Sequence, residues 1–309
     1  MNENNHDQKI NKKIFRLELS DGSSIEINLP LISNKISKSS FAFSLHKAGS
    51  SLLTGLLQDY CRKLSIPTFN FPGILFNHGL DENKVIITDD LKNLFKELKY
   101  CYIGWRNYMQ LLDAADLCSS RNVFWVRDPR DRLISFYFSF ARSHVLPEAG
   151  ELRETIQNQR KSLKLRTPDD DAKKRMIPFV IDILDLYHTK LPPENTRIYR
   201  YEDVIFKKKE WLTDMVNYFD LPRDELVIKM VAKSHDIRPD SENPNAHIRQ
   251  VTPGNYSKHF SSETIEILNN GMKKILDCYG YLQDKDFEKK LVFALEGNAA
   301  ARILNTPLK

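Results

Sequence analysis

The sequence has 309 residues, of which 41% are hydrophobic and 28% are charged, and these proportions are ordinary for a soluble globular protein. This length is enough for one large α/β domain or two small ones with an ample core. The formal net charge of +5 suits an anionic small ligand, but it is too small and too dispersed to indicate a nucleic-acid-binding protein.

The cysteines and the start of the chain indicate the cellular setting. Cys61, Cys101, Cys118 and Cys278 lie far apart and form no CxxC or Cys/His pair, so we expect neither a zinc site nor a disulfide framework. The polar start of the chain does not resemble a signal peptide, and no apolar run approaches the length of a membrane span. We therefore expect a soluble, cytoplasmic protein without a membrane partner.

The first part of the chain, residues 1–38, is expected to form an extension. Residues 1 to about 10 contain almost no apolar side chains, which predicts disorder. Residues 13–19 and 24–29 alternate polar and apolar residues on either side of a Gly-containing turn, and this pattern predicts a β-hairpin. We assign no chemistry to this extension and place the main domain at residues 39–309.

A ligand site is first indicated by the turn at residues 46–51. Residues 41–45 have the pattern of a buried strand, and leucines recur at helical spacing from residue 50 to about 64. The free N–H groups of the helix start, the helix dipole and the Lys47 ammonium would converge on one spot. Gly49 would let a ligand approach the backbone closely.

Two interpretations of this turn stay open from its own residues. It is either an anion-binding cradle or a capped turn that carries a solvated lysine. The order of its residues differs from the GxxxxGK[ST] loop of nucleoside triphosphatases, because Lys47 precedes Gly49. This difference argues against an ordinary ATP or GTP site.

The next part of the chain continues the strand-then-helix pattern. Residues 65–79 are rich in proline and aromatic residues, and we expect them to be irregular and to line a pocket. Residues 99–104 and 122–126 predict two more buried strands, since the second is dense in β-favouring residues. A short helix is expected at residues 110–118.

A second ligand-binding turn follows the strand at residues 122–126. Asp128 is a plausible cap and Pro129 fits the first helical turn. Arg127 would lie at the carboxyl end of its strand, where open α/β sheets bind ligands. Ser135 would follow two helical turns later. An exposed, salt-bridged arginine and a serine bonded to its own helix are the competing interpretations.

The remaining elements complete the predicted fold. Residues 144–176 are charged and show little periodicity, so we expect a mobile, lid-like insertion. The other expected elements are helices at 179–186, 211–219, 263–279 and about 286–303, a strand at 196–201, and a long basic loop at 234–261. The order predicts an α/β fold: a P-loop-like three-layer sandwich with a central parallel sheet flanked by helices, plus the N-terminal β-hairpin.

Four separated stretches resemble, in order, the sulfotransferases that use 3′-phosphoadenosine 5′-phosphosulfate (PAPS). Residues 46–51 (HKAGSS) are similar to the PKxGTT loop for the 5′-phosphosulfate, and residues 126–138 to the RxPxDxxxSxY element for the 3′-phosphate. Residues 201–203 match the YED that ends a later strand, and residues 249–260 resemble the RKGxxGDWKxxF loop. The resemblance covers roughly residues 40–282.

The resemblance implies roles for particular residues. Lys47 would stabilise charge on the bridging oxygen as the nucleotide leaves, in a reaction that depends on positioning and charge stabilisation. The implied nucleotide-binding residues are His46, Lys47, Ala48, Gly49, Ser50, Ser51, Leu52, Arg127, Ser135, Tyr201, Ser234, His235, Arg249 and Gln250. Tyr201 also fits a simple strand end followed by a helix. No metal is required.

Several residues depart from the family pattern. Gln250 follows Arg249 where the family has a lysine, which removes one positive charge from the 3′-phosphate site. His235 replaces an aromatic residue that commonly stacks on adenine, and Leu52 stands where a tryptophan is frequent. Adenine contact at these two positions is therefore open.

The general base is the largest departure. Many members of the family carry a histidine just after the strand that here ends at residue 104, but residues 104–107 contain Arg106 and no histidine. An arginine cannot act as a base at neutral pH. We name His78 as the best remaining candidate and His46 as the next, although a lone histidine is more often structural. The departure leaves both O- and N-sulfation open.

The sequence therefore predicts an enzyme that transfers a sulfuryl group from PAPS, as co-substrate, to a hydroxyl or amine of a small-molecule acceptor and releases 3′-phosphoadenosine 5′-phosphate (PAP). A homodimer is left open. Two other functions are weighed: a small-molecule kinase of related architecture, and a non-catalytic nucleotide-binding protein descended from such an enzyme. The missing GK[ST] argues against the kinase, and the missing histidine favours the binding protein.

Overall fold

The computed structural model describes residues 13–31 and 36–282. The centre of the fold is a five-stranded sheet, in which every neighbouring pair of strands is parallel. Its order across the sheet is β4 (Thr68–Phe69), β5 (Cys101–Trp105), β3 (Ser40–Ser44), β6 (Arg121–Val126) and β7 (Thr196–Arg200). Because β3 lies in the middle, the turn that follows it is flanked by the ends of β5 and β6.

Alternate residues of each strand face two separate hydrophobic cores. Phe41 and Phe43 belong to one core and Ala42 to the other, and in β6 Phe124 is in the first core and Trp125 in the second. A side-chain period of two with both faces buried is the pattern of a parallel sheet covered by helices on both sides. The predicted fold class is confirmed.

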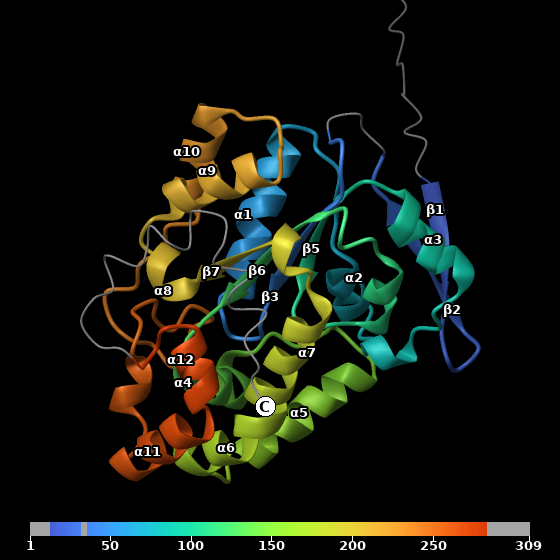
Figure 1. The fold of residues 1–309 in the computed structure, drawn as a ribbon. Helices are drawn as coiled ribbons and strands as arrows, with labels where there is room; N and C mark the ends of the chain where they lie inside the picture. The colour runs from blue at the N-terminus through green and yellow to red at the C-terminus, as the bar shows by residue number, and fades with distance from the viewer. Residues whose placement is uncertain (1–12, 32–35, 283–309) are drawn as a thin grey trace, which may run out of the picture.

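Helices cover the two faces and extend below the strand ends (Figure 1). The second core is completed by α1 (Ser50–Lys63), α9 (Lys208–Tyr218) and α10 (Glu225–Ser234). The first core includes α4 (Pro129–Phe138), the π-helical stretches at Ser139–Ser143 and Met176–Ile181, α5 (Glu151–Leu163), α6 (Pro168–Arg175) and α7 (Asp182–Lys190). Tyr187 of α7 stacks on Phe124 with ring centroids 4.7 Å apart.

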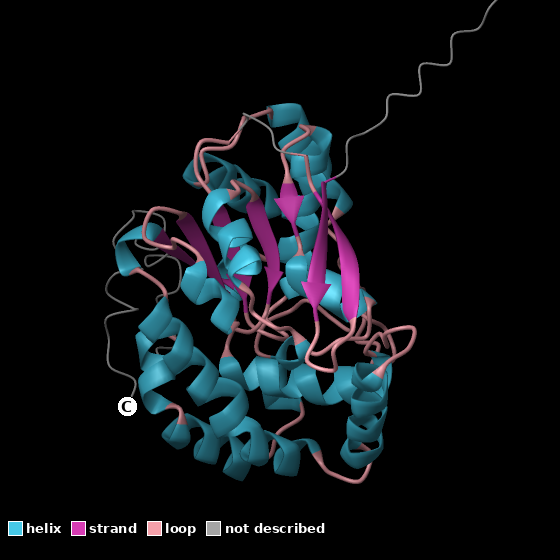
Figure 2. Cartoon of the chain, turned by 90° about the vertical axis from the view of Figure 1, so that its right-hand side faces the viewer, coloured by secondary structure: helices cyan, strands magenta, loops and turns pink. Residues whose placement is uncertain are grey.

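The remaining elements lie around this framework. The N-terminal hairpin of β1 (Lys13–Glu18) and β2 (Ser24–Leu29) is a separate antiparallel pair, as predicted, and Figure 2 shows its two long arrows beside the central strands. The other helices are α2 (Phe71–Asn77), α3 (Asp89–Glu97), α8 (Tyr201–Val204), α11 (Ser262–Gly271) and α12 (Lys273–Cys278), with short 3₁₀ turns at Glu82–Lys84, Gln110–Ala114, Pro193–Asn195 and Asn255–Lys258.

Four sequence predictions were wrong in detail. The helix expected at residues 110–118 is a short 3₁₀ turn at Gln110–Ala114. Residues 65–79 are not irregular: they form β4 and α2, and Phe69 and Phe71 are buried in the first core. Residues 144–176 form α5 and α6 instead of an aperiodic segment. The predicted helix at 263–279 is two helices that meet at Met272. The expected disorder of residues 1 to about 10 and the helix at 286–303 lie outside the described residues.

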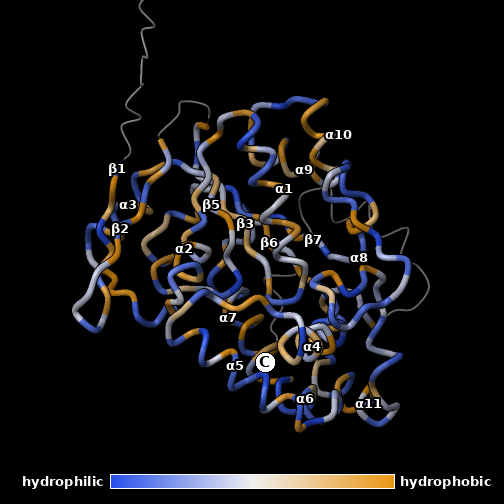
Figure 3. Tube along the Cα trace, turned by 180° about the vertical axis from the view of Figure 1, so that it is seen from behind, coloured by the Kyte–Doolittle hydropathy of each residue, from blue (hydrophilic) through white to orange (hydrophobic). Residues whose placement is uncertain are grey.

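The polarity of α5 explains why its helix was missed. Its sequence, ELRETIQNQRKSL, buries only Ile156 and Leu163, so the apolar stripe that identifies a helix is nearly absent. Figure 3 shows this helix as a mostly hydrophilic segment of the chain. Whether α5 and α6 act as a lid stays a prediction.

Candidate functional site

An open cavity lies where β3, β6 and β7 end, with an empty volume of about 1110 Å³. This volume includes solvent space at the open side of the cavity. Eleven of the predicted site residues line it: Lys47, Gly49, Ser50, Ser51, Leu52, Arg127, Ser135, Tyr201, His235, Arg249 and Gln250. Residues from both predicted phosphate-binding turns therefore face one space.

The turn after β3 has an unusual backbone. Lys47 has a φ of 65° and Gly49 a φ of 95°, both in the left-handed region that most L-residues avoid. A Cβ on Gly49 would lie 3.1 Å from the Trp125 ring and 3.3 Å from the Tyr201 ring. Alternation of left- and right-handed residues before a helix start directs successive N–H groups into a concave anion site.

Two predicted site residues of this turn, His46 and Ala48, do not line the cavity but stabilise the turn. The Ala48 side chain is fully buried in the first core. The carbonyl oxygen of His46 accepts a hydrogen bond of 3.1 Å from Nε of Arg132. Arg132 is itself fully buried, so His46 and Ala48 hold the turn in place. The pKa of His46 is lowered well below its usual value, first by burial and then by Arg106 and Lys47.

Lys47 is mostly buried between several basic groups. Its Nζ donates a hydrogen bond of 2.9 Å to Oγ of Ser139, in the π-helical stretch after α4. Burial lowers the pKa of Lys47 to about 8, with further contributions from Arg106, Arg127 and Arg249. A lysine in this state gains its full charge most readily when an anion binds beside it.

Arg127 lies at the end of β6, as predicted, with only 7% of its surface exposed. Its guanidinium donates to Oδ2 of Asp131 at 3.3 Å and to the carbonyl oxygen of Lys47 at 3.4 Å, and it lies 4.3 Å from the centroid of the Tyr201 ring. Nε is buried without a partner. Arg127 is thus fixed by its neighbours and keeps a donor for a ligand.

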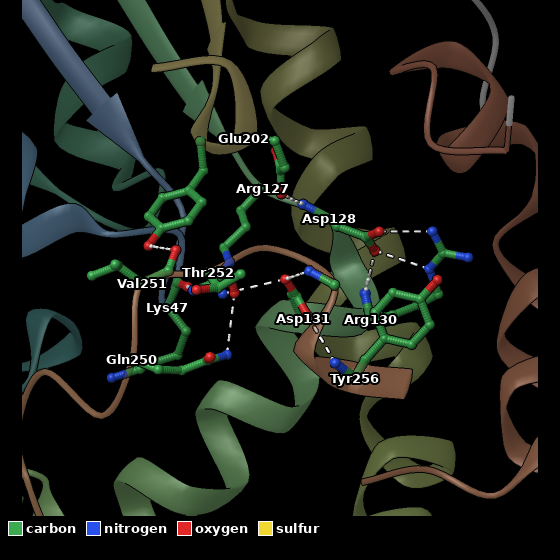
Figure 4. A network of polar contacts seen from close by, with 12 residues as sticks. Lys47, Arg127, Asp128, Arg130, Asp131, Glu202, Gln250, Val251, Thr252 and Tyr256 are labelled. Atoms are coloured by element: carbon green, nitrogen blue, oxygen red, sulfur yellow. Dashed lines mark hydrogen bonds and ion pairs between the residues drawn. The ribbon is translucent and has the colours of Figure 1, made fainter. Parts of the chain in front are cut away.

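Asp131 connects Arg127 to the long loop that carries Arg249 (Figure 4). Besides Arg127, its carboxylate accepts hydrogen bonds from the backbone N–H groups of Gly254 at 2.8 Å and Tyr256 at 2.9 Å. These residues follow Arg249 in the long loop. Since Asp131 is fully buried, it fixes the long loop against the start of α4.

The turn after β6 is also held from β7. The Asp128 side chain caps α4 through the N–H of Arg130, as predicted. The backbone N–H of Asp128 donates to Oε1 of Glu202 at 2.9 Å, and the Tyr201 hydroxyl donates to the carbonyl oxygen of Val251 at 2.8 Å. Glu202 and Tyr201 therefore position the two phosphate-binding segments, and Tyr201 also lines the cavity.

Arg249 belongs to the long loop and lines the cavity. It forms an ion pair with Glu242, and its guanidinium carbon lies 4.7 Å from the centroid of the Phe138 ring. Gln250 follows it, with its side-chain nitrogen donating to the carbonyl oxygen of Thr252 at 3.2 Å. Arg249 and Arg127 face the same cavity.

The far end of the cavity contains the residues expected near adenine. Nε2 of His235 lies 2.9 Å from Oδ2 of Asp59, and its ring packs over Gly55, where a Cβ would come within 2.7 Å. Leu52 lines the same space. Ser234 does not: its Oγ donates to the carbonyl oxygen of Val231 at 2.9 Å at the end of α10.

The structure does not bring His78 to this site. It follows the last residue of α2, where its backbone N–H closes the helix, and it is exposed. It is not among the residues that line the cavity. The physical reason is that α2 packs its apolar residues into the first core and directs its end towards solvent, so we correct the prediction that His78 is the base.

Four residues without a predicted role surround Lys47. The charge of Arg106 acts on both Lys47 and His46, His144 lies near Lys47 with its pKa lowered to about 3, first by burial and then by the Lys47 charge, and His247 lines the cavity. Asp131 is the fourth. Arg106 stands where the family pattern has a histidine, and Asp131 belongs to the RxPxD motif, so the sequence contained a signal for both. No spacing in the sequence connects His144 to Lys47.

Comparisons with known proteins identify the fold. No family model and no curated protein sequence matches the chain. Among solved structures, it is similar to mouse sulfotransferase SULT7A1 complexed with PAP, at 11% identity, with 90% of this chain and 98% of that chain covered and a TM-score of 0.50. The chain has the fold of that sulfotransferase.

A retinol dehydratase in complex with androsterone and the inactive cofactor PAP also matches, at 13% identity, with 84% of this chain and 85% of that chain covered and a TM-score of 0.43.

Two further properties concern the described residues alone. They contain no group of three or more His, Cys, Asp or Glu side chains that could hold a metal ion. None of their helices is both long and apolar enough to cross a membrane.

Proposed function

We propose that the protein is a sulfotransferase that uses PAPS and a small-molecule acceptor. One observation carries the proposal: a single cavity is lined by Lys47 with its left-handed turn and also by Arg127 and Arg249. PAPS has anionic groups at both its 5′ and 3′ positions, so it needs two separate cationic sites within one nucleotide length. The fold and the four motifs support the same nucleotide.

Different residues around the cavity would bind different parts of PAPS. The N–H groups and hydroxyls at Ser50 and Ser51 would bind the 5′-phosphosulfate at the start of α1. Arg127 and Arg249, with Ser135, would bind the 3′-phosphate, because a guanidinium offers two parallel donors to a phosphate. Leu52, Tyr201 and His235 would contact the adenosine, with Gln250 at the edge.

The transfer is redox-neutral and requires one proton to leave. The acceptor oxygen or nitrogen attacks the sulfur atom, and the bond between sulfur and the bridging phosphate oxygen breaks. The sulfuryl group is then bonded to the acceptor, and PAP leaves with the former bridging oxygen on its 5′-phosphate. Protonated Lys47 would stabilise the charge that develops on the bridging oxygen. The proton of the acceptor passes to a base or to solvent.

His247 replaces His78 as the proposed proton acceptor. It lines the cavity, and partial burial together with the charges of Lys47 and Arg106 lowers its pKa. A neutral imidazole beside the reacting centre can take a proton at neutral pH. We place His247 on the side of Lys47 that faces away from Arg127, which we call the acceptor side, because the charges of both Lys47 and Arg106 act on it.

The segment at residues 144–176 is proposed to cover the acceptor. Arg160 of α5 donates to the carbonyl oxygens of Phe140 at 3.2 Å and His144 at 2.7 Å. These contacts place the last turn of α5 against the stretch that carries Ser139, the partner of Lys47. We further propose that the enzyme acts in the cytoplasm.

Calorimetry with nucleotides tests the nucleotide site. We expect PAP to bind at least about 100-fold more tightly than ATP or ADP, because only PAP offers a phosphate to Arg127 and Arg249. Equal affinity for PAP and ATP would contradict the proposal and favour the kinase.

Transfer of radiolabelled sulfate from PAPS to a panel of phenols, alcohols and amines tests the chemistry. Labelled product that forms at a rate proportional to enzyme concentration is the expected result. Tight PAP binding without any labelled product, across acceptors with and without an anionic group, would instead favour the non-catalytic nucleotide-binding protein.

A further inference from the structure

The acceptor side of Lys47 contains a cation that the proposed reaction does not use. Arg106 follows β5 directly, and β5 lies beside β3 with Trp105 paired to Phe43. The turn with Lys47 follows β3 by two residues. Arg106 therefore lies next to this turn, on the opposite side from Arg127, which follows β6.

A bulge in β5 precedes Arg106. Phe41 pairs with Tyr102, but Phe43 pairs with Trp105, so β5 contains one extra residue. Gly104 has a φ of 88°, and a Cβ there would lie 2.0 Å from Oδ1 of Asn70. Bulges re-aim the residues that follow them and are common beside active sites. The position of Arg106 is therefore specified by the backbone of the strand.

Arg106 has no partner for its charge within the described part of the chain. It makes no hydrogen bond or ion pair to any described residue, and its Nε is buried without a partner. Burial lowers its pKa, yet a guanidinium remains charged at neutral pH. A half-buried arginine whose Nε is shielded from solvent and unpaired is unfavourable unless a ligand supplies the missing anion.

The groups around Arg106 are also basic. The charges that lower the pKa of His144 are those of Lys47, Arg106, Arg160 and His247. The same holds for His247, where Lys47 and Arg106 contribute. The charges of Lys47 and Arg106 thus reach both histidines, so His247, which lines the cavity with Lys47, lies close to both cations.

We propose that the acceptor is itself an anion, a small hydroxy or amino compound whose carboxylate, phosphate or sulfate group binds Arg106. This inference rests on the proposed sulfotransferase function. The guanidinium would hold the oxyanion in a bidentate pair. The nucleophilic hydroxyl or amine of the same molecule then lies on the other side, facing Lys47 and His247.

The proposal also accounts for the charge balance of the reaction. The donor is a polyanion, and a second anion can approach it closely only where cations reduce the repulsion. Lys47 contacts the donor and Arg106 the acceptor, so the two anions are held by separate charges. A neutral phenol or sterol would leave the half-buried Arg106 without a counter-charge.

The test compares matched acceptors that differ only in charge. We expect 3-(4-hydroxyphenyl)propionate to be sulfated with a kcat/KM at least about tenfold above that of its methyl ester, because only the acid can pair with Arg106. In Arg106→Gln, kcat/KM for the acid should fall about 100-fold and that for the ester by less than about threefold. Affinity for PAP should stay within about twofold of the original protein.

Two variants separate this effect from a general loss of charge or folding. Arg142→Gln removes an exposed arginine from the neighbouring π-helical stretch and should leave the preference for the acid unchanged. Arg106→Lys keeps a charge without the bidentate geometry and should retain part of the preference. An original enzyme without preference for the acid, or equal losses for acid and ester in Arg106→Gln, would overturn the proposal.

A binding measurement keeps the test independent of the proposed function. 3-Phenylpropionate, which has no nucleophile, should bind the nucleotide-free protein in calorimetry and should bind Arg106→Gln at least about tenfold more weakly. Loss of PAP binding in the original protein with this carboxylate binding intact would reject the sulfotransferase alone. Carboxylate binding that is absent, or unchanged in Arg106→Gln, would reject the anion site.

Discussion

The two sides of Lys47 differ in how their positive charge is neutralised. On the proposed nucleotide side, Arg127 pairs with Asp131 at 3.3 Å and Arg249 pairs with Glu242. On the acceptor side, Arg106 pairs with no residue that the structure describes. Arg106 and Arg127 have equivalent positions in the sheet, because each directly follows a strand that lies next to β3.

This difference in pairing indicates that the two sides bind different kinds of ligand. Paired arginines are held rigidly, and their remaining donors are presented in one geometry before the ligand arrives, which favours tight binding of one constant co-substrate. An unpaired arginine leaves the counter-charge to the ligand. Under the proposed function, the nucleotide side would determine the affinity for PAPS, and the acceptor side would determine which molecule is sulfated.

The largest effect is expected from removing the residue between the two sides. Lys47→Ala should lower kcat by about 100- to 1000-fold, because it removes a preorganised charge at the position where negative charge develops. PAP binding should weaken by only about tenfold, since the N–H groups of the turn remain. Steady-state rates and calorimetry measure both. Losses of equal size would show that Lys47 only binds the nucleotide.

The next effect isolates the nucleotide side. Arg127→Gln should weaken PAP binding by about 100-fold and adenosine 5′-phosphosulfate binding by less than about threefold, because the second ligand has no 3′-phosphate. Arg127→Lys should recover little of the affinity, since a lysine cannot form the bidentate pair. Thermal unfolding is the control, because Asp131 loses one of its partners. Equal losses for both nucleotides would contradict the placement of Arg127.

The strand-to-helix turns explain how much the sequence could predict. The turn after β3 and the turn after β6 are local: each takes its ligand-binding residues from one continuous segment with a strand period before it and a helix period after it. Lys47, Gly49 and Arg127 therefore appear in the sequence in the context in which they act. The parallel sheet follows from the same repeated pattern.

The acceptor side could not be predicted in this way. His144 approaches Lys47 only because the π-helical stretch after α4 folds back beside it, and His247 does so from a loop without periodicity. His78 was preferred because it lies in an aromatic segment, but α2 directs that segment into the core. Contacts between segments far apart in the sequence leave no local pattern, so the base was assigned wrongly.

A smaller effect concerns the charge of Lys47 itself. Its pKa is lowered to about 8, so Lys47 is protonated below this pH and increasingly neutral above it. Because only the protonated form attracts an anion, PAP affinity should fall about tenfold between pH 7 and pH 9. The phosphates of PAP are largely ionised at pH 7 and change little up to pH 9, since their second pKa is about 6. Calorimetry in buffers of different ionisation enthalpy should detect proton uptake on binding near pH 8.

Lys47→Arg is the matched control for this pH dependence. An arginine stays protonated throughout the range, so its PAP affinity should be constant from pH 7 to pH 9. A pH dependence that persists in Lys47→Arg would assign the titration to another group. A flat profile in the original protein would contradict the lowered pKa.

The smallest effect tests whether the ion pair between Arg249 and Glu242 competes with binding of the 3′-phosphate. Glu242 is bonded to Arg249 and lies 3.1 Å from Nε2 of His259, so the 3′-phosphate must share or replace a carboxylate that already neutralises this arginine. Glu242→Gln removes the competing charge but keeps the shape of the side chain. PAP should then bind about three- to fivefold more tightly, a modest gain because the pair is partly solvated.

Nucleotides with and without the 3′-phosphate distinguish this effect from a general change in charge. The gain in Glu242→Gln should be absent for adenosine 5′-phosphosulfate. Glu225→Gln, which removes a carboxylate paired with Arg223 on the surface, should leave PAP affinity unchanged. Weaker PAP binding in Glu242→Gln would show the opposite, that Glu242 orients Arg249 for the phosphate. The nucleotide side would then depend on its paired carboxylates for preorganisation, which would widen its contrast with Arg106.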